Sequence, residues 1–319
     1  MNVSVLGCGR WGSFITWYLS SNGHNVCEWG REDGKSFKIL KETGKNEYVT
    51  LNKNVNLTSN LSEAVSGAEL IVVSVLSQSL KDVLTLAKEY GATSKDLVLC
   101  MKGLDEDTGM RLSEIAISLG YSKDKVAVWL GPGHIEEFTK GKPNCMVIDS
   151  NSKELTIKLA DSLRSDLIRF YYGDDLIGNE IGAASKNVMG IAAGMLDGGG
   201  YSTLKGPLMA RGAREIGRLI KKMGGNELSA YGLCHLGDYE TTLFSPFSQN
   251  RRFGEAYIKG EKFLKSAEGV KTAKALKLLG QKYGEELPIT NAVYKIIYEN
   301  AEPLTTFNEL FSRSSRKEF

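Results

Sequence analysis

A glycine turn near the amino terminus constrains the fold of this chain more than any other feature. The apolar run Val3–Leu6 leads into Gly7-Cys8-Gly9-Arg10-Trp11-Gly12, and a helix-like segment and a second apolar run follow. A G-x-G-x-x-G turn in this context opens a dinucleotide-binding βαβ unit. Gly7 permits the tight turn, Gly9 lets the backbone approach a pyrophosphate, and Gly12 lets helix and strand pack closely. We predict a dinucleotide at the amino terminus of this helix, the alternative being a glycine turn without a ligand.

The first half of the chain alternates short apolar runs with amphipathic segments. Near-continuous runs such as Leu70–Val75 are typical of strands covered on both faces of a parallel sheet. Helical patterns lie between the runs. This alternation predicts an α/β Rossmann-like domain over 1–176, doubly wound around a mostly parallel sheet. The predicted strands are Asn2–Leu6, Asn25–Trp29, Glu69–Val75, Asp96–Met101, Lys125–Leu130, Asn144–Asp149 and Leu167–Tyr172.

The second half has a different character from about Asp175 onward. A Gly- and Ala-rich segment, 177–199, is followed by helical patterns at 208–223 and 272–283, and Pro288 stands where a further helix would begin. We therefore predict an all-helical carboxy-terminal domain over 177–319. The polar tail, 312–319, is expected to fray.

Composition excludes several classes of partner. The net charge of the 319 residues is only +2, which gives no electrostatic footprint for nucleic acid or a membrane surface. The apolar stretches are shorter than the ~20 residues of a membrane span, and no basic segment precedes the first one, so we expect a cytoplasmic protein. Three scattered histidines predict no metal site. The strand-like runs around Cys27, Cys100 and Cys145 predict small buried thiols and no disulfide framework.

The choice of coenzyme depends on the residues after the second strand, Cys27-Glu28-Trp29-Gly30-Arg31-Glu32-Asp33. An acidic side chain at the end of this strand favours NAD, whereas a basic one pairs with the 2′-phosphate of NADP. Arg31 slightly favours NADP over NAD because a guanidinium fits phosphate in a fork. The neighbouring carboxylates weaken this inference. The alternative for Arg31 is a solvated surface charge.

Three polar residues are candidates for catalysis by their position alone. Lys102 follows the predicted strand LVLCM, at the edge of a parallel sheet where ligands bind. Lys186 lies in the Gly- and Ala-rich helix, where a charge is costly unless it is paired or catalytic. Asp238 lies in the polar run HLGDYETT. The structural alternatives are a loop lysine, a snorkelling surface lysine and a helix cap, respectively.

Taken together, the motifs resemble the bacterial-type NAD(P)-dependent glycerol-3-phosphate dehydrogenases nearly from end to end. The matching segments are the turn with Trp11, Trp29-Gly30-Arg31, Lys102 to Gly109, Gly131-Pro132, Glu180 to Gly194, Leu236 to Asp238, Asn250 to Gly254, Ala267 to Thr272, and Leu287 to Tyr294.

The resemblance implies reversible hydride transfer between dihydroxyacetone phosphate and sn-glycerol 3-phosphate. Lys186 would be the general acid/base, Asp238 would orient it, and Lys102 would hold or polarise substrate oxygens, while the helical domain closes over the nicotinamide. The implied substrate-binding residues are Lys102, Gly131, Lys186, Asn187, Asp238, Thr242, Ser248, Gln249, Asn250 and Arg251. The implied cofactor-binding residues are Gly7, Gly9, Arg10, Trp11, Gly12, Arg31, Lys102, Ile135 and Glu268.

Three departures from the family pattern concern the substrate end. Gln249 stands where the family has an arginine that meets the substrate phosphate and the cofactor, and Gly133 stands where it has a serine near the substrate. A neutral amide still donates hydrogen bonds to phosphate but brings no charge. His134 could partly replace the serine. Near the aspartate, the usual Gly-Leu-Gly-Asp begins with His235 instead.

These departures leave three hypotheses open. The first is an active glycerol-3-phosphate dehydrogenase in which Arg251 or Arg252 compensates for Gln249. The second is a paralogue that reduces a related small hydroxyketone or keto acid. The third is a non-catalytic nucleotide-binding protein, against which the retention of Lys102, Lys186 and Asp238 argues. A homodimer is common for this architecture, but no residue of the sequence marks an interface.

Overall fold

The computed structural model describes residues 1–312 and 314 and divides into two compact units. The first unit comprises Met1–Lys102 and Met110–Glu180, and the second comprises Gly103–Gly109 and the chain from Ile181 onward. The chain enters the second unit at Gly103, returns to the first after Gly109, and passes into the second again inside one helix, α8 (Leu176–Gly198). The fraying predicted for the tail falls mainly on residues 313 and 315–319, which lie outside the described residues.

Within the described residues, the first unit is built on one sheet of eight strands in the order β3-β2-β1-β4-β5-β6-β7-β8. All neighbouring strands are parallel except β6 and β7, which pair antiparallel. Strand order therefore reverses between β1 and β4, as in a doubly wound fold. The strands are β1 (Asn2–Leu6), β2 (Asn25–Trp29), β3 (Asn56–Thr58), β4 (Leu70–Val73), β5 (Asp96–Leu99), β6 (Val126–Leu130), β7 (Asn144–Ser150) and β8 (Ile168–Tyr172).

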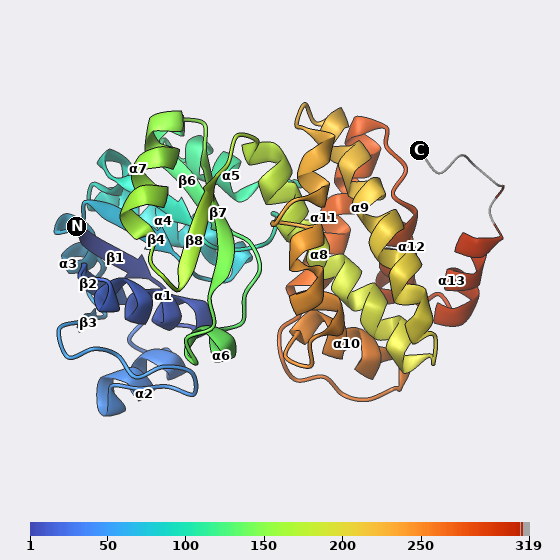
Figure 1. Cartoon of the computed structure of the whole chain (residues 1–319), viewed down its shortest axis with the longest axis horizontal. Coiled ribbons are helices and arrows are strands. Elements are labelled where there is room, and N and C mark those ends of the chain that lie inside the picture. Colours follow the sequence, from blue (N-terminus) through green and yellow to red (C-terminus); the bar gives the residue numbers. More distant parts are fainter. Residues whose placement is uncertain (313, 315–319) are drawn as a thin grey trace. The chain divides into compact units, whose positions relative to one another are not determined.

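Helices cover both faces of this sheet (Figure 1). On one face, Phe14 and Tyr18 of α1 and Leu159 of α7 pack with Val5 of β1 in a single apolar core. On the other face, Ser4 of β1 donates a hydrogen bond to the backbone of α3. The helices are α1 (Arg10–Ser21), α2 (Lys35–Thr43), α3 (Leu61–Ser66), α4 (Leu80–Glu89), α5 (Leu112–Ser118), α6 (Ile135–Phe138) and α7 (Lys153–Leu163).

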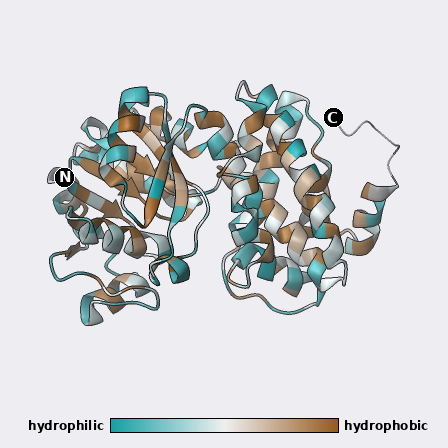
Figure 2. Ribbon diagram, in the orientation of Figure 1, coloured by the Kyte–Doolittle hydropathy of each residue, from teal (hydrophilic) through white to brown (hydrophobic). Residues whose placement is uncertain are grey.

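The second unit is helical, and its described residues contain no strand. Its longest helix, α8, is buried along most of its length, as its Gly- and Ala-rich composition allows. Figure 2 shows brown, apolar residues between the helices and teal, polar ones on their outer surfaces and loops. Besides α8, the helices are α9 (Lys205–Lys222), α10 (Gln249–Ile258), α11 (Glu268–Tyr283), α12 (Pro288–Tyr298) and α13 (Pro303–Phe311). The predicted fold class is confirmed for both halves.

Two further predictions can be compared with the structure. No helix among the described residues is long and apolar enough to span a membrane.

All five cysteines are free. The burial predicted for Cys27, Cys100 and Cys145 is wrong, because each of them is only partly buried. The buried cysteines are Cys8 and Cys234. The error arises because two of these three side chains lie in strands near the edges of the sheet, where cover is incomplete, and Cys100 follows the end of β5.

Candidate active site

The glycine turn is closely packed at Gly7 and Gly12 and open at Gly9. The Gly7 amide donates to the carbonyl of Trp29 at 2.9 Å, and a Cβ on Gly12 would lie 1.7 Å from the Gly7 oxygen, so helix α1 and strand β1 could not approach with a larger residue there. A Cβ on Gly9, in contrast, would meet nothing within 4 Å. The open space lies at the amino terminus of α1, where unpaired N–H groups and the helix dipole favour an anion. These residues fit the pyrophosphate of a dinucleotide.

Arg10, inside the turn, is engaged by other protein groups. Its guanidinium donates to both carboxylate oxygens of Glu136 on α6, at 2.8 and 2.6 Å, and lies 5.1 Å from the centre of the Tyr48 ring. Ile135, beside Glu136, is buried. Sequence analysis named Arg10 and Ile135 but not Glu136 or Tyr48. Two consecutive acids after the Gly-Pro loop were the available signal for the ion pair.

The end of β2 presents a basic side chain to solvent. Arg31 is exposed, and its side chain makes no hydrogen bond or ion pair with a described residue. Glu28, the acid within β2, is fully buried, and burial raises its pKa to about 8 against the partial effect of the Ser13 and Thr16 hydroxyls. A buried carboxyl cannot accept from a ribose, so the charged groups that this strand end offers to a ligand are Arg31 and the exposed carboxylates of Glu32 and Asp33.

Lys102 is fixed beside the turn. Its ammonium donates to the carbonyl of Gly131 at 2.6 Å and lies 5.9 Å from the centre of the Trp11 ring. The loop that carries Gly131 also explains one departure from the family pattern. A Cβ on Gly133 would lie 2.4 Å from the ring of Phe138, so a serine does not fit at position 133 in this packing. His134 forms the amino-terminal cap position of α6.

In the helical unit, Lys186 lies between an acid and a hydroxyl. Its ammonium is 2.9 Å from Oδ2 of Asp238 and donates to the Thr242 hydroxyl at 2.7 Å. Asp238 ends the short 3₁₀ helix Leu236–Asp238, and Thr242 lies in the π-helical turn Glu240–Phe244 that follows it. The Lys186 and Asp238 side chains are 10% and 1% exposed, which strengthens their attraction because water screens it little. The Thr241 hydroxyl also donates to Asp238.

A second polar group joins three helices next to this lysine. The Asn250 amide donates to the Asn187 side chain at 3.0 Å and accepts from the amide of Gly269 at 2.9 Å. Asn187 follows Lys186 on α8, and Glu268 begins α11 immediately before Gly269. Ser248 caps α10 by accepting from the Arg251 amide at 3.3 Å. The amino termini of α10 and α11 are therefore held at the segment of α8 that carries the lysine.

Gln249 and the two arginines after it differ in the hydrogen bonds and ion pairs that their side chains make. The Gln249 amide donates to Phe247 O at 3.2 Å, while its buried Oε1 has no hydrogen-bond partner. Arg251 is committed, because it pairs with Asp197 at 2.8 Å and with Glu255 at 3.0 Å. Arg252 is exposed and pairs with no described residue.

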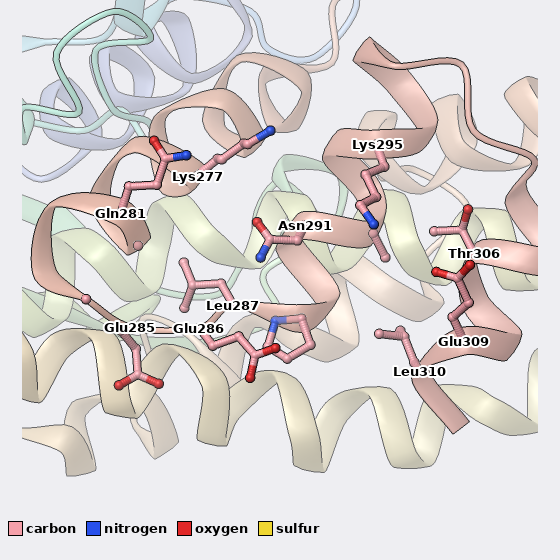
Figure 3. A pocket seen from close by; sticks show the side chains of 14 residues that line it. Lys277, Gln281, Glu285, Glu286, Leu287, Asn291, Lys295, Thr306, Glu309 and Leu310 are labelled. Atoms are coloured by element: carbon pink, nitrogen blue, oxygen red, sulfur yellow. The ribbon is translucent and has the colours of Figure 1, made fainter. Parts of the chain in front are cut away.

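A separate hollow lies between the carboxy-terminal helices. It has a volume of about 540 Å³ and is lined by residues of α11, α12 and α13 and their connections. Figure 3 shows lysines, such as Lys277 and Lys295, and acids, such as Glu286 and Glu309, around it. None of the predicted site residues lines this hollow. Its mixed charge favours no single class of ligand.

Comparison with known families matches both halves of the chain. Residues 2–156 match the model described as NAD-dependent glycerol-3-phosphate dehydrogenase N-terminus, and residues 175–308 match its C-terminus counterpart. The chain belongs to the NAD-dependent glycerol-3-phosphate dehydrogenase family.

Similar members of this family come from several bacteria. The glycerol-3-phosphate dehydrogenase [NAD(P)+] of Chlorobium phaeobacteroides is 33% identical, the alignment covering 100% of this chain and 99% of the relative. The enzyme of the same name from Fusobacterium nucleatum is 34% identical, with coverage of 100% and 98%. The crystal structure of the Coxiella burnetii glycerol-3-phosphate dehydrogenase superimposes with a TM-score of 0.91 at 28% identity, covering 98% of this chain and 99% of that one.

Proposed function

We propose that this member of the glycerol-3-phosphate dehydrogenase family catalyses NAD(P)-dependent, reversible hydride transfer between dihydroxyacetone phosphate and sn-glycerol 3-phosphate. The observation that carries the proposal is the buried Lys186 ammonium, held by Asp238 at 2.9 Å and Thr242 at 2.7 Å. A reaction that creates an alkoxide at a former carbonyl needs a proton donor of this kind. The names of the similar bacterial enzymes support the same activity.

In the direction of reduction, Lys186 gives a proton from Nζ to the carbonyl oxygen of the substrate, and in oxidation the neutral amine takes that proton back. Asp238 holds the ammonium in place and balances its charge, and Thr242 fixes its direction. The bound nicotinamide supplies or accepts the hydride. Lys102 holds an oxygen of the substrate. Each of these groups is already ordered by protein contacts, which lowers the entropy lost on reaching the reactive geometry.

The proposed coenzyme site consists of the glycine turn, Trp11, Arg31, Lys102, Ile135 and Glu268. Arg10 contributes through its backbone, because its guanidinium is paired with Glu136. The exposed Arg31 and the burial of Glu28 favour NADP over NAD. Neither coenzyme is excluded by these residues.

The proposed phosphate site is the amino terminus of α10. Backbone N–H groups there and the side chains of Gln249 and Asn250 supply hydrogen bonds to an anion. Because Arg251 is paired with Asp197 and Glu255, Arg252 is the remaining cation of this helix that can add charge. Gly131, Asn187 and Ser248 complete the proposed substrate site.

A second candidate is a paralogue with the same hydride chemistry on a hydroxyketone or keto acid of different charge. One observation favours it: the family's arginine is replaced by Gln249, whose buried Oε1 has no partner. An unpaired acceptor suits a hydroxyl donor better than a phosphate.

The deciding experiment is an assay in both directions with both coenzymes. We expect NADPH to be oxidised in the presence of dihydroxyacetone phosphate, and NADP+ to be reduced in the presence of sn-glycerol 3-phosphate, with weaker activity for NAD(H). Turnover of a non-phosphorylated hydroxyketone or a keto acid in preference to dihydroxyacetone phosphate would support the paralogue. Binding of coenzyme with no turnover of any of them would support a non-catalytic protein. The cytoplasmic location and the homodimer stay predictions of the sequence, to be tested by cell fractionation and light scattering.

A further inference from the structure

His235 departs from the family pattern and is buried close to the proposed catalytic pair. The residue is fully buried, with 0% of its surface exposed. Burial lowers the pKa of the imidazole to about 4, against smaller opposing effects of the Gly182 and Gly212 backbones and of Asp238. The ring is therefore neutral at physiological pH, where an ordinary histidine would begin to take up a proton.

Both ring nitrogens of His235 have partners. Nδ1 is 2.8 Å from the carbonyl oxygen of Gly182, and Nε2 is 2.7 Å from the hydroxyl of Tyr239. A carbonyl can only accept, so Nδ1 carries the proton and Nε2 accepts from the Tyr239 hydroxyl. Tyr239 is also 0% exposed, and burial raises its pKa well above 10, so its hydroxyl stays a donor. The tautomer protonated at Nδ1 satisfies both of these contacts.

The Gly182 contact connects the histidine to the helix of the lysine. Gly182 lies one turn before Lys186 on α8, on the same face of the helix. Its carbonyl is the one that an α-helix pairs with the amide of Lys186. A Cβ on Gly182 would lie only 3.0 Å from Cβ of His235, so the absence of a side chain there allows the close approach.

The backbone of the same histidine holds the aspartate. The Asp238 amide donates to the His235 carbonyl at 3.0 Å, and the Asp238 carboxylate reaches Lys186 at 2.9 Å. His235 therefore contacts Asp238 through its backbone, and it contacts α8, the helix that carries Lys186, through its side chain. The charged and titratable groups around the ring are Asp238 and Lys186, with Tyr239 next to it and Glu215 of α9 facing Tyr239.

We propose that His235 is a positioning residue for the dehydrogenase reaction, in which the neutral ring fixes the segment of Asp238 to α8 and so holds the carboxylate against Lys186. The proposal rests on the proposed function, because its consequence for turnover requires Lys186 to move a proton. A glycine at position 235 keeps the hydrogen bond from the Asp238 amide to the backbone carbonyl of residue 235. It removes the hydrogen bond from the imidazole to Gly182 of α8, which we call the bridge. In this chain, the Asp238 segment is held by an imidazole that the family pattern lacks.

The test compares three variants with a matched control. His235→Gly removes the bridge, His235→Asn keeps a donor that can reach Gly182, and Tyr239→Phe removes only the hydroxyl that binds Nε2. Tyr121→Phe is the control, because its buried hydroxyl donates to Leu84 O at 3.0 Å in the other unit. Each is assayed for kcat and KM of substrate and coenzyme over a range of pH.

We expect His235→Gly to lower kcat for reduction by about tenfold to a hundredfold, because small displacements of catalytic groups have effects of this size. The KM of the coenzyme should stay unchanged. The alkaline limb of kcat should move to lower pH, because an ammonium without a fixed carboxylate loses its proton more easily. His235→Asn should recover most of the rate, Tyr239→Phe should show a smaller shift in the same direction, and Tyr121→Phe should show none.

A His235→Gly or Tyr239→Phe enzyme with the wild-type rate and wild-type alkaline limb would overturn the proposal. If His235→Gly does not fold, the comparison of Tyr239→Phe with Tyr121→Phe decides. A wild-type protein without turnover refutes the proposed function instead. In that case NMR tests the positioning role of His235 independently of turnover. In ¹⁵N-histidine spectra, resolved easily for three histidines, His235 should stay neutral and protonated at Nδ1, and exchange of the Lys186 ammonium protons should quicken in His235→Gly. Ordinary titration of His235 or unchanged exchange counts against the positioning role.

Discussion

The chemistry proposed at the scale of single residues depends on one ammonium. The Lys186 ammonium is held by the Asp238 carboxylate and the Thr242 hydroxyl. We expect Lys186→Ala to lower kcat by about 10²- to 10⁴-fold, because that is the usual contribution of a general acid. Coenzyme affinity, measured by quenching of protein fluorescence, should stay close to wild type. Lys205→Ala, which removes a lysine paired with Asp197 in the same unit, is the control. Substantial residual turnover in Lys186→Ala would refute the assigned role.

A second prediction at this scale concerns the charge of the substrate. Gln249→Arg places a guanidinium where the family has one, and a charge-assisted bond to phosphate is worth about 1.5–3 kcal/mol. If dihydroxyacetone phosphate is the substrate, its KM should fall by about tenfold or more, since 1.4 kcal/mol is a factor of ten. Arg252→Gln should raise the same KM. An unchanged KM in both variants, measured by initial rates, would favour the paralogue over the glycerol-3-phosphate dehydrogenase.

The candidate residues and the pairing of Lys186 with Asp238 could be named from the sequence because they lie in short motifs, whereas the partners of Arg10, Arg251 and His235 could not. The ion pair of Arg10 with Glu136 and the bridge from His235 to Gly182 join residues far apart in the chain. No local pattern shows which carbonyl a buried imidazole will reach. No local pattern predicts the ion pair of Arg251 with Asp197 either, and the role of Arg251 toward the substrate stays a prediction.

At the scale of elements, the close crossing of α8 and α10 organises the proposed substrate site. A Cβ on Gly254 of α10 would lie 2.1 Å from the Ile191 oxygen of α8, and one on Gly194 would lie 1.9 Å from the Arg251 oxygen. Gly254→Ala should therefore force the helices apart and lower the free energy of unfolding by roughly 1–3 kcal/mol or more. It should also raise the KM of the substrate, because α10 carries Gln249 and Asn250.

The matched control for this crossing is Gly206→Ala on α9, where a Cβ would meet nothing within 4 Å. That change should instead stabilise the protein by roughly 0.4–1 kcal/mol, because it restricts the unfolded chain. Urea unfolding followed by circular dichroism measures both variants. Equal stability of Gly254→Ala and the wild type would show that the crossing is looser than its geometry implies.

The sequence predicted most elements of this fold because their patterns are local. The predicted bounds of β1 and β2 agree with the structure, and the Gly- and Ala-rich segment is the single helix α8. The strand β3 was not predicted, because three residues, Asn56–Thr58, are too few to show a period. The antiparallel pairing of β6 with β7 was not predicted either, since hydrophobicity shows burial but not strand direction.

At the scale of the whole molecule, three buried carboxyls make stability depend on pH in one direction. Burial raises the pKa of Glu28 to about 8, of Glu215 to about 7 and of Asp149 to about 6. In the unfolded chain these groups ionise near their ordinary values, so above those values the unfolded state binds fewer protons than the native state. The free energy of unfolding must then fall as pH rises from the ordinary pKa to the raised one. Sequence alone could not show this, because burial of each acid depends on tertiary packing.

Glu28→Gln isolates the largest of these contributions. For one group the loss amounts to about 1.4 kcal/mol per pH unit, and for Glu28 it runs from its ordinary pKa of 4.5 to about 8. A neutral glutamine mimics the protonated acid, so the variant should match the wild type near pH 4.5 and exceed it increasingly up to pH 8. Glu89→Gln, an exposed acid on α4, should give no such divergence. Calorimetry across this range should show the gain in the transition of the first unit, which contains Glu28, because two-unit proteins need not unfold in one step. A constant difference between Glu28→Gln and wild type at all pH values would mean that Glu28 is ionised in the native protein.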